Sequence, residues 1–176
     1  MIKLAAGFRR LYVGFMMWLI GRLLEASSRT DRVIQNEAEA LPDGFGFSMT
    51  VMPGGPGFVV QKQPDGTFYC KRGRDELEAD LVISFKHVRH AFLILSFQES
   101  TARSFVNDRV VLNGEIDLGM IVVRCLDRME CLVLPKFIAV RAVKRYPDIP
   151  LGEKIQLSIK IYLRVIAGLF RSGHVK

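Results

Sequence analysis

The spacing of apolar residues changes along the chain, and each spacing predicts a different kind of element. Residues 2–25 and 30–39 have the pattern of helices, with Ser28 or Thr30 able to cap the second one. From Phe45 the period becomes two, because apolar residues alternate with small or polar ones as they do in half-buried strands. Turn signals rich in Pro, Asp and Gly separate the alternating segments. The strands predicted in this way are 45–51, 58–63, 67–72, 81–85 and 110–112.

Helical spacing fills the intervals between the later strands and the end of the chain. The helices predicted there are 86–97, 101–107, 117–131 with Asp117 as a cap, and 152–171. This order of elements predicts an α+β domain, in which helices cover a mostly antiparallel sheet of about five strands. We divide the chain into a basic, apolar helical arm at 1–40 and a domain at 41–176.

Two of these helices carry more apolar surface than a single packing face needs. In the helix at 117–131, one apolar face can cover the sheet and a second remains, made by Met120, Val123 and Leu126. In the helix at 152–171, apolar residues occupy most of the circumference and leave only a narrow charged stripe. Surplus apolar surface of this kind lines a cavity, or faces a partner or a membrane.

The run LYVGFMMWLIG at residues 11–21 is uncharged and almost wholly apolar. A membrane span needs about 20 such residues, and arginines flank this run on both sides, which argues against a span. A secretory signal fits the outline of a basic segment before a short apolar core, but no clear small-residue cleavage site follows. Two further interpretations stay open: a helix that packs on its own domain, and a helix that docks on a membrane.

Glycine recurs every seven residues in this N-terminal helix. Gly7, Gly14 and Gly21 therefore lie along one stripe, which permits the close approach of another element. The rest of the circumference is apolar and must be buried in protein or in a bilayer interface. For the second case, the membrane-contact residues that we predict are Phe15, Trp18, Leu19, Arg9 and Arg10.

Composition and charge strengthen the case for apolar surface outside an ordinary core. Apolar residues make up 49% of the 176 residues and the mean hydropathy is +0.20, and both values are high for a soluble domain of this size. The net charge is +4 over 1–32, −4 over 33–132 and +7 over 133–176. Basic, apolar ends suit the anionic face of a membrane. Nucleic acid is not predicted as a partner, because the basic residues are not interleaved with stacking aromatics.

The residue types that carry catalysis or bind metals form no recognisable pattern. Cys70, Cys125 and Cys131 are odd in number and fit no zinc spacing, so we expect idle or buried thiols. His87 and His90 lie three apart without a third ligand, and we expect them to be a surface pair. We therefore predict no catalytic residue, no metal site and no cofactor, and we do not expect an enzyme.

One segment has a family resemblance: ADLVISFKHVRHAFLILSFQESTARSFVNDRVVLNGEIDLGMIVVRCLD, residues 79–127. The segment contains, in this order, an Ala-Asp pair, a strand ending in Ser or Thr, an aromatic residue in a short helix, and a basic strand running into Gly. These are Ala79-Asp80, Ser84, Phe105, 109–112 and Gly114. In these features the segment resembles the sterol carrier protein (type 2) lipid-binding domain. Glu115 departs from that family, which commonly has Asp or Asn there.

Within that family, the chain looks most like the bacterial accessory factors for ubiquinone biosynthesis that carry this domain. The chain length, the basic apolar N-terminus and the continuation LDRMECLVLPKFIA at 126–139 carry that likeness. The resemblance implies a five-stranded sheet with helices on one side, around an apolar tunnel for a lipid tail that the C-terminal helix borders. It also implies a cargo such as an isoprenoid quinone precursor, presented to biosynthetic enzymes.

The surplus apolar faces of the helices agree with a lipid-lined hollow, although a dry core would use the same residues. The lining residues that we predict are Phe92, Leu95, Phe105, Met120, Val123, Leu126, Phe137, Ile159, Leu163 and Ile166. We therefore expect a non-enzymatic lipid-binding or carrier protein that is cytoplasmic and peripheral on the inner membrane, where it holds an isoprenoid or acyl tail.

The expected partners are a membrane lipid or isoprenoid quinone precursor, an anionic membrane surface, biosynthetic enzymes and a second copy of the chain in a homodimer. Two alternatives stay open. One is a scaffold module that binds proteins through the same apolar helices, with the glycine stripe as its contact. The other is an enzyme acting on a hydrophobic substrate.

Overall fold

The computed structural model describes residues 2–71, 79–143 and 147–171 and contains one sheet with helices packed against it. The strands lie in the order β3-β2-β1-β4-β5, and β1 pairs with β4 in parallel while the other neighbours are antiparallel. The predicted α+β class with a mostly antiparallel five-stranded sheet is confirmed. The elements are α1 Ile2–Ser28, α2 Arg32–Glu39, β1 Gly46–Val51, β2 Gly57–Lys62, β3 Phe68–Lys71, β4 Leu81–Phe85, α3 Val88–Leu95, α4 Thr101–Val106, β5 Val110–Asn113, α5 Ile116–Val133, α6 Lys136–Ala142 and α7 Leu151–Arg171.

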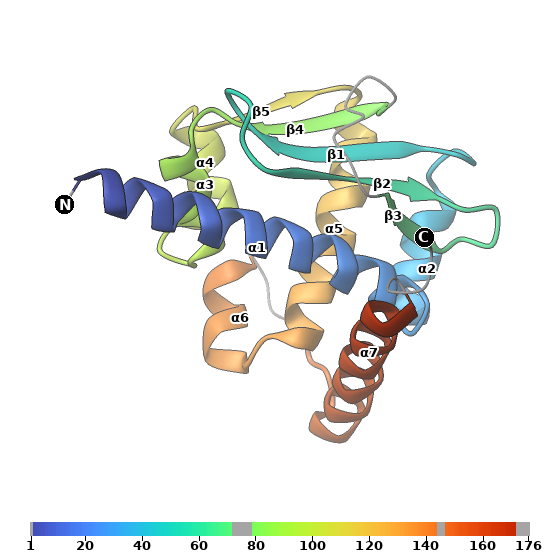
Figure 1. Cartoon of the computed structure of the whole chain (residues 1–176). Helices are drawn as coiled ribbons and strands as arrows, with labels where there is room; N and C mark the ends of the chain where they lie inside the picture. The colour runs from blue at the N-terminus through green and yellow to red at the C-terminus, as the bar shows by residue number, and fades with distance from the viewer. Residues whose placement is uncertain (1, 72–78, 144–146, 172–176) are drawn as a thin grey trace.

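Helix α1 packs across β2 and β3 of its own sheet, as Figure 1 shows. Val13, Met17 and Leu24 are completely buried on the face that it turns to the core. Gly21 allows the close approach, because a Cβ at this position would lie 2.7 Å from the Cys70 sulfur. Of the two interpretations left open for this helix, the structure shows the one in which it packs on the domain.

Side chains of α1 also protect β3, which is one of the two edge strands of the sheet. The Phe68 amide donates to Ser28 Oγ at 2.9 Å, and the Cys70 amide donates to Glu25 Oε2 at 3.4 Å. These bonds occupy amide groups that an open sheet edge would leave free for another strand. The N-terminal helix therefore completes the sheet as well as covering it.

Helix α2 is joined to α5 by two ion pairs. Arg128 Nε lies 2.7 Å from Asp31 Oδ2, and Arg124 Nε lies 2.7 Å from Glu37 Oε2. Asp31 also caps α2, since its side chain accepts a hydrogen bond from the Val33 amide. Residues before and after position 40 thus share one core and its polar contacts. The boundary predicted at residue 40 stays a prediction.

The Ala-Asp pair and the glycine of the family resemblance meet at one end of the sheet. Asp80 Oδ2 accepts a hydrogen bond from the Gly46 amide at 2.8 Å, which fixes β1 beside β4. Gly114 has a φ of +129°, and a Cβ there would lie 2.6 Å from the Asp80 carbonyl oxygen. The chain can therefore turn from β5 into α5 only with glycine at this position.

Two details of the helices differ from the prediction. The N-cap of α5 is Glu115 instead of Asp117, because the turn at Gly114 lets the helix begin at Ile116. Asp117 lies in the first turn, where a carboxylate still favours the helix dipole. Helix α6 was not predicted, and it follows Pro135, which serves as its N-cap residue.

Helix α7 is attached to the end of α5 by three hydrogen bonds. Lys154 Nζ donates to the Leu134 carbonyl at 2.8 Å, Ser158 Oγ to that of Leu132 at 2.6 Å, and Tyr162 Oη to that of Val133 at 2.8 Å. These acceptors include carbonyls that the last turn of a helix leaves without intrahelical partners. Figure 1 shows α6 and α7 beyond α1, on the side of the molecule away from the sheet.

Candidate functional site

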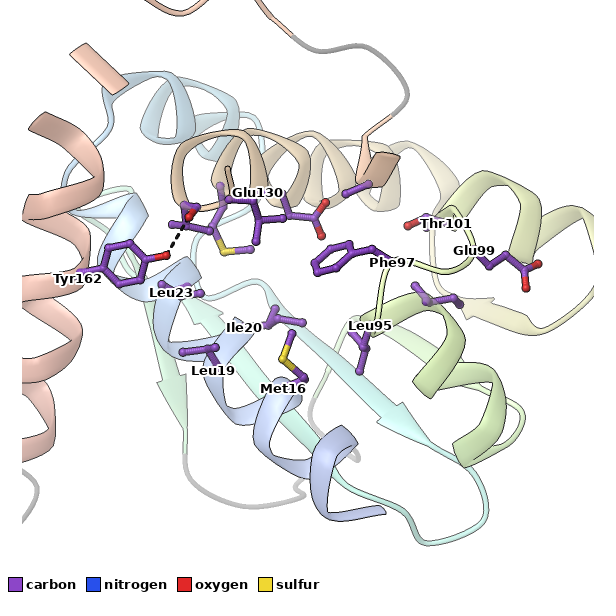
Figure 2. A pocket seen from close by; sticks show the side chains of 15 residues that line it. Met16, Leu19, Ile20, Leu23, Leu95, Phe97, Glu99, Thr101, Glu130 and Tyr162 are labelled. Carbon is purple, nitrogen blue, oxygen red and sulfur yellow. Dashed lines mark hydrogen bonds between the residues drawn. The ribbon is translucent and has the colours of Figure 1, made fainter. Parts of the chain in front are cut away.

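A small cavity lies between α1, α5 and the segment that joins α3 to α4. Its volume is about 110 Å³, and most of its wall is aliphatic or aromatic. Figure 2 shows these side chains converging from α1 on one side and from α5 on the other. The lining residues are Met16, Leu19, Ile20, Leu23, Ile94, Leu95, Phe97, Glu99, Thr101, Met129, Glu130, Val133, Leu134, Ala142 and Tyr162.

A larger groove of about 630 Å³ lies between the start of α6 and the N-terminal half of α7. Its lining residues are Pro135, Lys136, Asp148, Ile149, Leu151, Lys154, Ile155, Ser158, Ile159 and Tyr162. Tyr162 lines both hollows, and its hydroxyl is held by the Val133 carbonyl at 2.8 Å. Burial raises the pKa of this phenol above its ordinary value of 10.0. Tyr162 therefore stands between the cavity and the groove as a neutral hydrogen-bond donor.

Two carboxyl groups lie in the wall of the cavity, and their surroundings differ. Glu99 accepts hydrogen bonds from Asn107 Nδ2 at 2.8 Å and from Arg109. Burial alone would raise the pKa of Glu99, but the Asn107 hydrogen bond and the Arg109 charge outweigh it and lower the pKa below its ordinary value. Burial and the neighbouring Asp127 charge raise the pKa of Glu130 to about 8.

An exposed apolar surface is formed by side chains along one side of α7 together with two on α6. We call it the α6–α7 apolar surface, and its residues are between 44 and 73% exposed. They are Phe137, Val140, Leu151, Ile155, Ile159, Tyr162, Leu163 and Ile166. On α7 these residues recur every three or four positions, so they form one stripe. The exposed basic residues Lys160 and Arg164 flank that stripe.

Helix α7 thus has three faces instead of two. One face, with Leu157, Ile161 and Val165, packs on the core, and Ile161 is completely buried. The second is the apolar stripe, and the third is polar. A helix that only covers its own domain needs the first and third faces alone. The second apolar side predicted for this helix is therefore present, but it faces outward.

The structure places two of the ten predicted lining residues at these hollows. Leu95 lines the cavity and Ile159 lines the groove. Three others are partly buried: Phe92, whose ring lies 5.2 Å from that of Tyr12, together with Val123 and Leu126. The remaining five are exposed: Phe105, Met120, Phe137, Leu163 and Ile166. The role of these ten residues in lipid binding stays a prediction.

The five predicted membrane-contact residues on α1 are not on a single face. Phe15, Arg9 and Arg10 are exposed, and Arg10 donates a hydrogen bond to the Gly54 carbonyl. Trp18 is partly buried with its ring 5.9 Å from that of Phe15, while Leu19 lines the cavity. Phe8 and Leu11, which we did not predict, are more than 60% exposed on the same helix. Membrane contact by α1 stays a prediction.

The sequence contained a signal for Glu130 that we did not use. The second apolar side predicted for α5 comprised Met120, Val123 and Leu126, and Glu130 continues that side one turn later. Asp127 also lies on this side, and charged residues on an apolar side mark a place where the helix meets a polar group or a hollow. The α1 residues of the cavity wall had no comparable signal, because that helix is apolar on nearly every side.

The cysteine side chains are buried in the fold, and the His87 imidazole caps a helix. All three cysteines are buried, as expected, and burial raises the pKa of Cys70 to about 11, of Cys125 to about 12 and of Cys131 to about 11. His87 caps α3 by accepting a hydrogen bond from the Arg89 amide at 3.1 Å. Across the described ranges, no group of three or more His, Cys, Asp or Glu residues is placed to hold a metal ion.

Over the same described residues, no helix combines the length and the hydropathy that a membrane crossing requires. Helix α1 has the length, but charged residues interrupt its apolar sequence. Helix α7 has a polar face along its whole length. The exposed apolar surfaces therefore belong to helices that are amphipathic or packed on the domain.

No protein-family model and no curated protein matches the sequence. Solved structures that are similar to the chain include the following three. UbiJ-SCP2 ubiquinone synthesis protein is 11% identical, with a TM-score of 0.46, over 69% of this chain and 98% of that one. The conserved protein TT1886 of Thermus thermophilus, described as a possible sterol carrier protein, is 13% identical, with a TM-score of 0.43, over 73% and 91%.

The third structure is sterol carrier protein 2 of Yarrowia lipolytica without ligand. It is 12% identical, with a TM-score of 0.40, over 75% of this chain and 95% of that one. The descriptions of all three refer to sterol carrier proteins, in the case of TT1886 as a possible member, and this is the family that residues 79–127 resemble. At these identities and TM-scores the likeness does not indicate which ligand the chain binds.

Proposed function

We propose that this protein is a non-enzymatic lipid-binding protein that docks on an anionic membrane and holds part of an acyl or isoprenoid lipid. The observation that carries the proposal is the α6–α7 apolar surface, which lies beside a groove and is flanked by Lys160 and Arg164. A basic amphipathic helix with a wide apolar face is typical of segments that lie in a membrane interface.

The membrane contact that we propose has an apolar and an electrostatic part. Burying the exposed side chains of α7 among acyl chains removes apolar surface from water, which is worth about 1.5–3 kcal/mol for a fully buried large side chain. The charges of Lys160 and Arg164 add about 1 kcal/mol each near an anionic surface. The net charge of +7 over 133–176 favours the same orientation.

The groove supports the proposal that a lipid chain binds next to this contact. Its volume of about 630 Å³ falls within the range of ligand pockets, roughly 300–1,000 Å³. Each methylene buried there contributes about 0.8 kcal/mol. The resemblance of residues 79–127 to a lipid-binding domain supports a lipid cargo. Because the chain also resembles ubiquinone accessory factors, the cargo that we propose is an isoprenoid quinone precursor.

The cavity and the groove differ from the enclosed tunnel that the family resemblance implied. The described residues form an open groove and a cavity of about 110 Å³, which is smaller than the cavity of about 150 Å³ known to admit benzene. A complete tail therefore does not fit inside the cavity. It would lie in the groove and along α7, where the membrane supplies the remaining cover.

Flotation with anionic vesicles tests membrane docking. The wild-type protein is expected to float with phosphatidylglycerol vesicles at low salt and to float less at high salt, because salt screens the basic residues. Ile159→Asp is expected to lower the affinity by about tenfold or more, since it removes a large apolar contact and adds a negative charge. Gln156→Asp is the matched control, because it adds the same charge on the exposed polar face of α7.

The outcomes separate this function from its alternative. Equal flotation of the two variants would contradict docking through the α6–α7 apolar surface. A protein that does not float, but forms a dimer that Ile159→Asp disrupts, would favour the scaffold module. Native mass spectrometry of protein purified without detergent tests the cargo, and a chain that neither carries nor takes up lipid would contradict the proposal.

A further inference from the structure

The cavity has a polar end that its structural hydrogen bonds leave unoccupied. Of its four polar lining residues, Glu99 is bonded to Asn107 and Arg109, and Tyr162 is bonded to the Val133 carbonyl. Within the part of the chain that the structure describes, the side chains of Glu130 and Thr101 accept and donate no such bond. Figure 2 shows the Glu130 carboxyl and the Thr101 hydroxyl on the same side of the Phe97 ring.

The charges around Glu130 favour its uncharged form. None of the lining residues is basic, and Asp127 stands one turn before Glu130 on α5. The other titratable groups of the wall are Glu99, which Arg109 pairs, and Tyr162, which is neutral. Burial first and Asp127 second raise the pKa of Glu130 to about 8, so the carboxyl is mostly protonated at neutral pH. A protonated carboxyl has an O–H to donate and a carbonyl oxygen to accept.

We propose, resting on the lipid-binding function above, that the cavity receives an uncharged, oxygen-bearing end of the lipid, with Glu130 as its hydrogen-bond partner. A hydroxyl or carbonyl group is small enough for a cavity of about 110 Å³, and its bond would satisfy a partly buried polar group. The chain of the lipid then passes Tyr162, which lines both hollows, and lies in the groove along α7.

The same walls disfavour charged ends. A carboxylate or a phosphate would enter an apolar cavity in which no lining residue is basic and in which Asp127 lies nearby. An ammonium group would pair with an ionised Glu130, but both charges would first lose their water in aliphatic surroundings. The site therefore selects among lipids of equal chain length by the charge of their ends.

Binding of three probes of equal chain length tests this selection: dodecanol, dodecanoate and dodecylamine, each measured by competitive native mass spectrometry at neutral pH. The wild-type chain is expected to bind dodecanol about tenfold more tightly than either charged probe, as one buried hydrogen bond and an avoided buried charge predict. Glu130→Gln should retain this preference, because an amide is neutral and donates. Glu130→Leu should weaken dodecanol binding, because it removes the hydrogen bond, while Glu153→Leu on the exposed face of α7 should not.

The pH dependence gives a second measurement that does not depend on a variant's folding. The affinity of the wild-type chain for 2-dodecanone, whose carbonyl only accepts, is expected to fall by severalfold as the pH rises through about 8, where Glu130 ionises and loses its O–H, whereas Glu130→Gln should show no such fall. Equal binding of the three probes, or a Glu130→Leu variant that binds dodecanol as tightly as the wild type, would overturn this inference and leave lipid binding intact. A wild-type chain that binds none of them would overturn the proposed function itself.

Discussion

Glu130 shows how one side chain can lower the stability of a fold at neutral pH. Its pKa of about 8 in the folded chain lies above its ordinary value of 4.5, so folding favours its protonated form. The associated stability is fully present below about pH 4.5 and is lost as the pH rises to about 8. A carboxyl with this behaviour lowers the stability of the fold at neutral pH, as groups at functional sites commonly do.

We predict that Glu130→Gln raises the free energy of unfolding at pH 8 and changes it little at pH 4.5. The expected gain at pH 8 is roughly 2–4 kcal/mol, since each pKa unit is worth about 1.4 kcal/mol and water around a partly exposed carboxyl screens part of the effect. Urea denaturation at the two pH values measures it, with the exposed Glu153→Gln as control. Parallel pH profiles for wild type and Glu130→Gln would contradict a buried, protonated carboxyl.

At the scale of elements, α7 combines a firm attachment with an outward apolar face. Lys154, Ser158 and Tyr162 recur every four residues and bind three consecutive carbonyls at the end of α5. The orientation of α7 about its own axis is therefore fixed, and the apolar stripe cannot turn inward without breaking these bonds. Attachment through backbone carbonyls leaves the apolar side chains free for another contact.

We predict that Ser158→Ala loosens α7, because it removes the 2.6 Å bond to the Leu132 carbonyl. The expected loss is about 1 kcal/mol of stability, the usual value for one hydrogen bond. Hydrogen exchange should show faster exchange for α7 amides than in the wild type, with little change in β1. Gln156→Ala, which removes a side chain from the exposed polar face, is the control. Uniformly faster exchange across the chain would instead indicate a global effect.

Residue spacing identified the elements better than it identified what covers them. The strand at 81–85 was predicted at its observed bounds, because alternation and flanking turns define a short buried strand locally. Spacing also showed that α5 and α7 have second apolar sides. It could not tell that the cavity lies at Glu130, near the end of α5, or that the second apolar side of α7 faces outward, because both depend on where α1 and α6 pack. Helix α6 was missed since its seven residues, directly after Pro135, give too short a pattern.

At the scale of the whole molecule, the N-terminal helix decides whether the chain has one folding unit or an arm and a domain. Helix α1 shares its core with the sheet and supplies Met16, Leu19 and Leu23 to the cavity. If it belongs to one cooperative unit, its central amides should exchange as slowly as those of β1. Faster exchange of α1 alone would support the boundary predicted at residue 40.

Two matched glycine substitutions test, by their effect on stability, whether α1 packs closely on the sheet. Gly21→Ala places a Cβ 2.7 Å from the Cys70 sulfur and 3.3 Å from the Phe58 ring, so α1 must move from the sheet, which costs about 1–3 kcal/mol. A Cβ added at Gly7 would have no other atom within 4 Å, so Gly7→Ala should stabilise the helix by roughly 0.5–1 kcal/mol. Thermal unfolding of both variants gives the comparison. Because the cavity wall includes α1, Gly21→Ala should also weaken lipid binding while Gly7→Ala does not. A Gly21→Ala variant with unchanged stability and binding would show that α1 packs less closely than this structure requires.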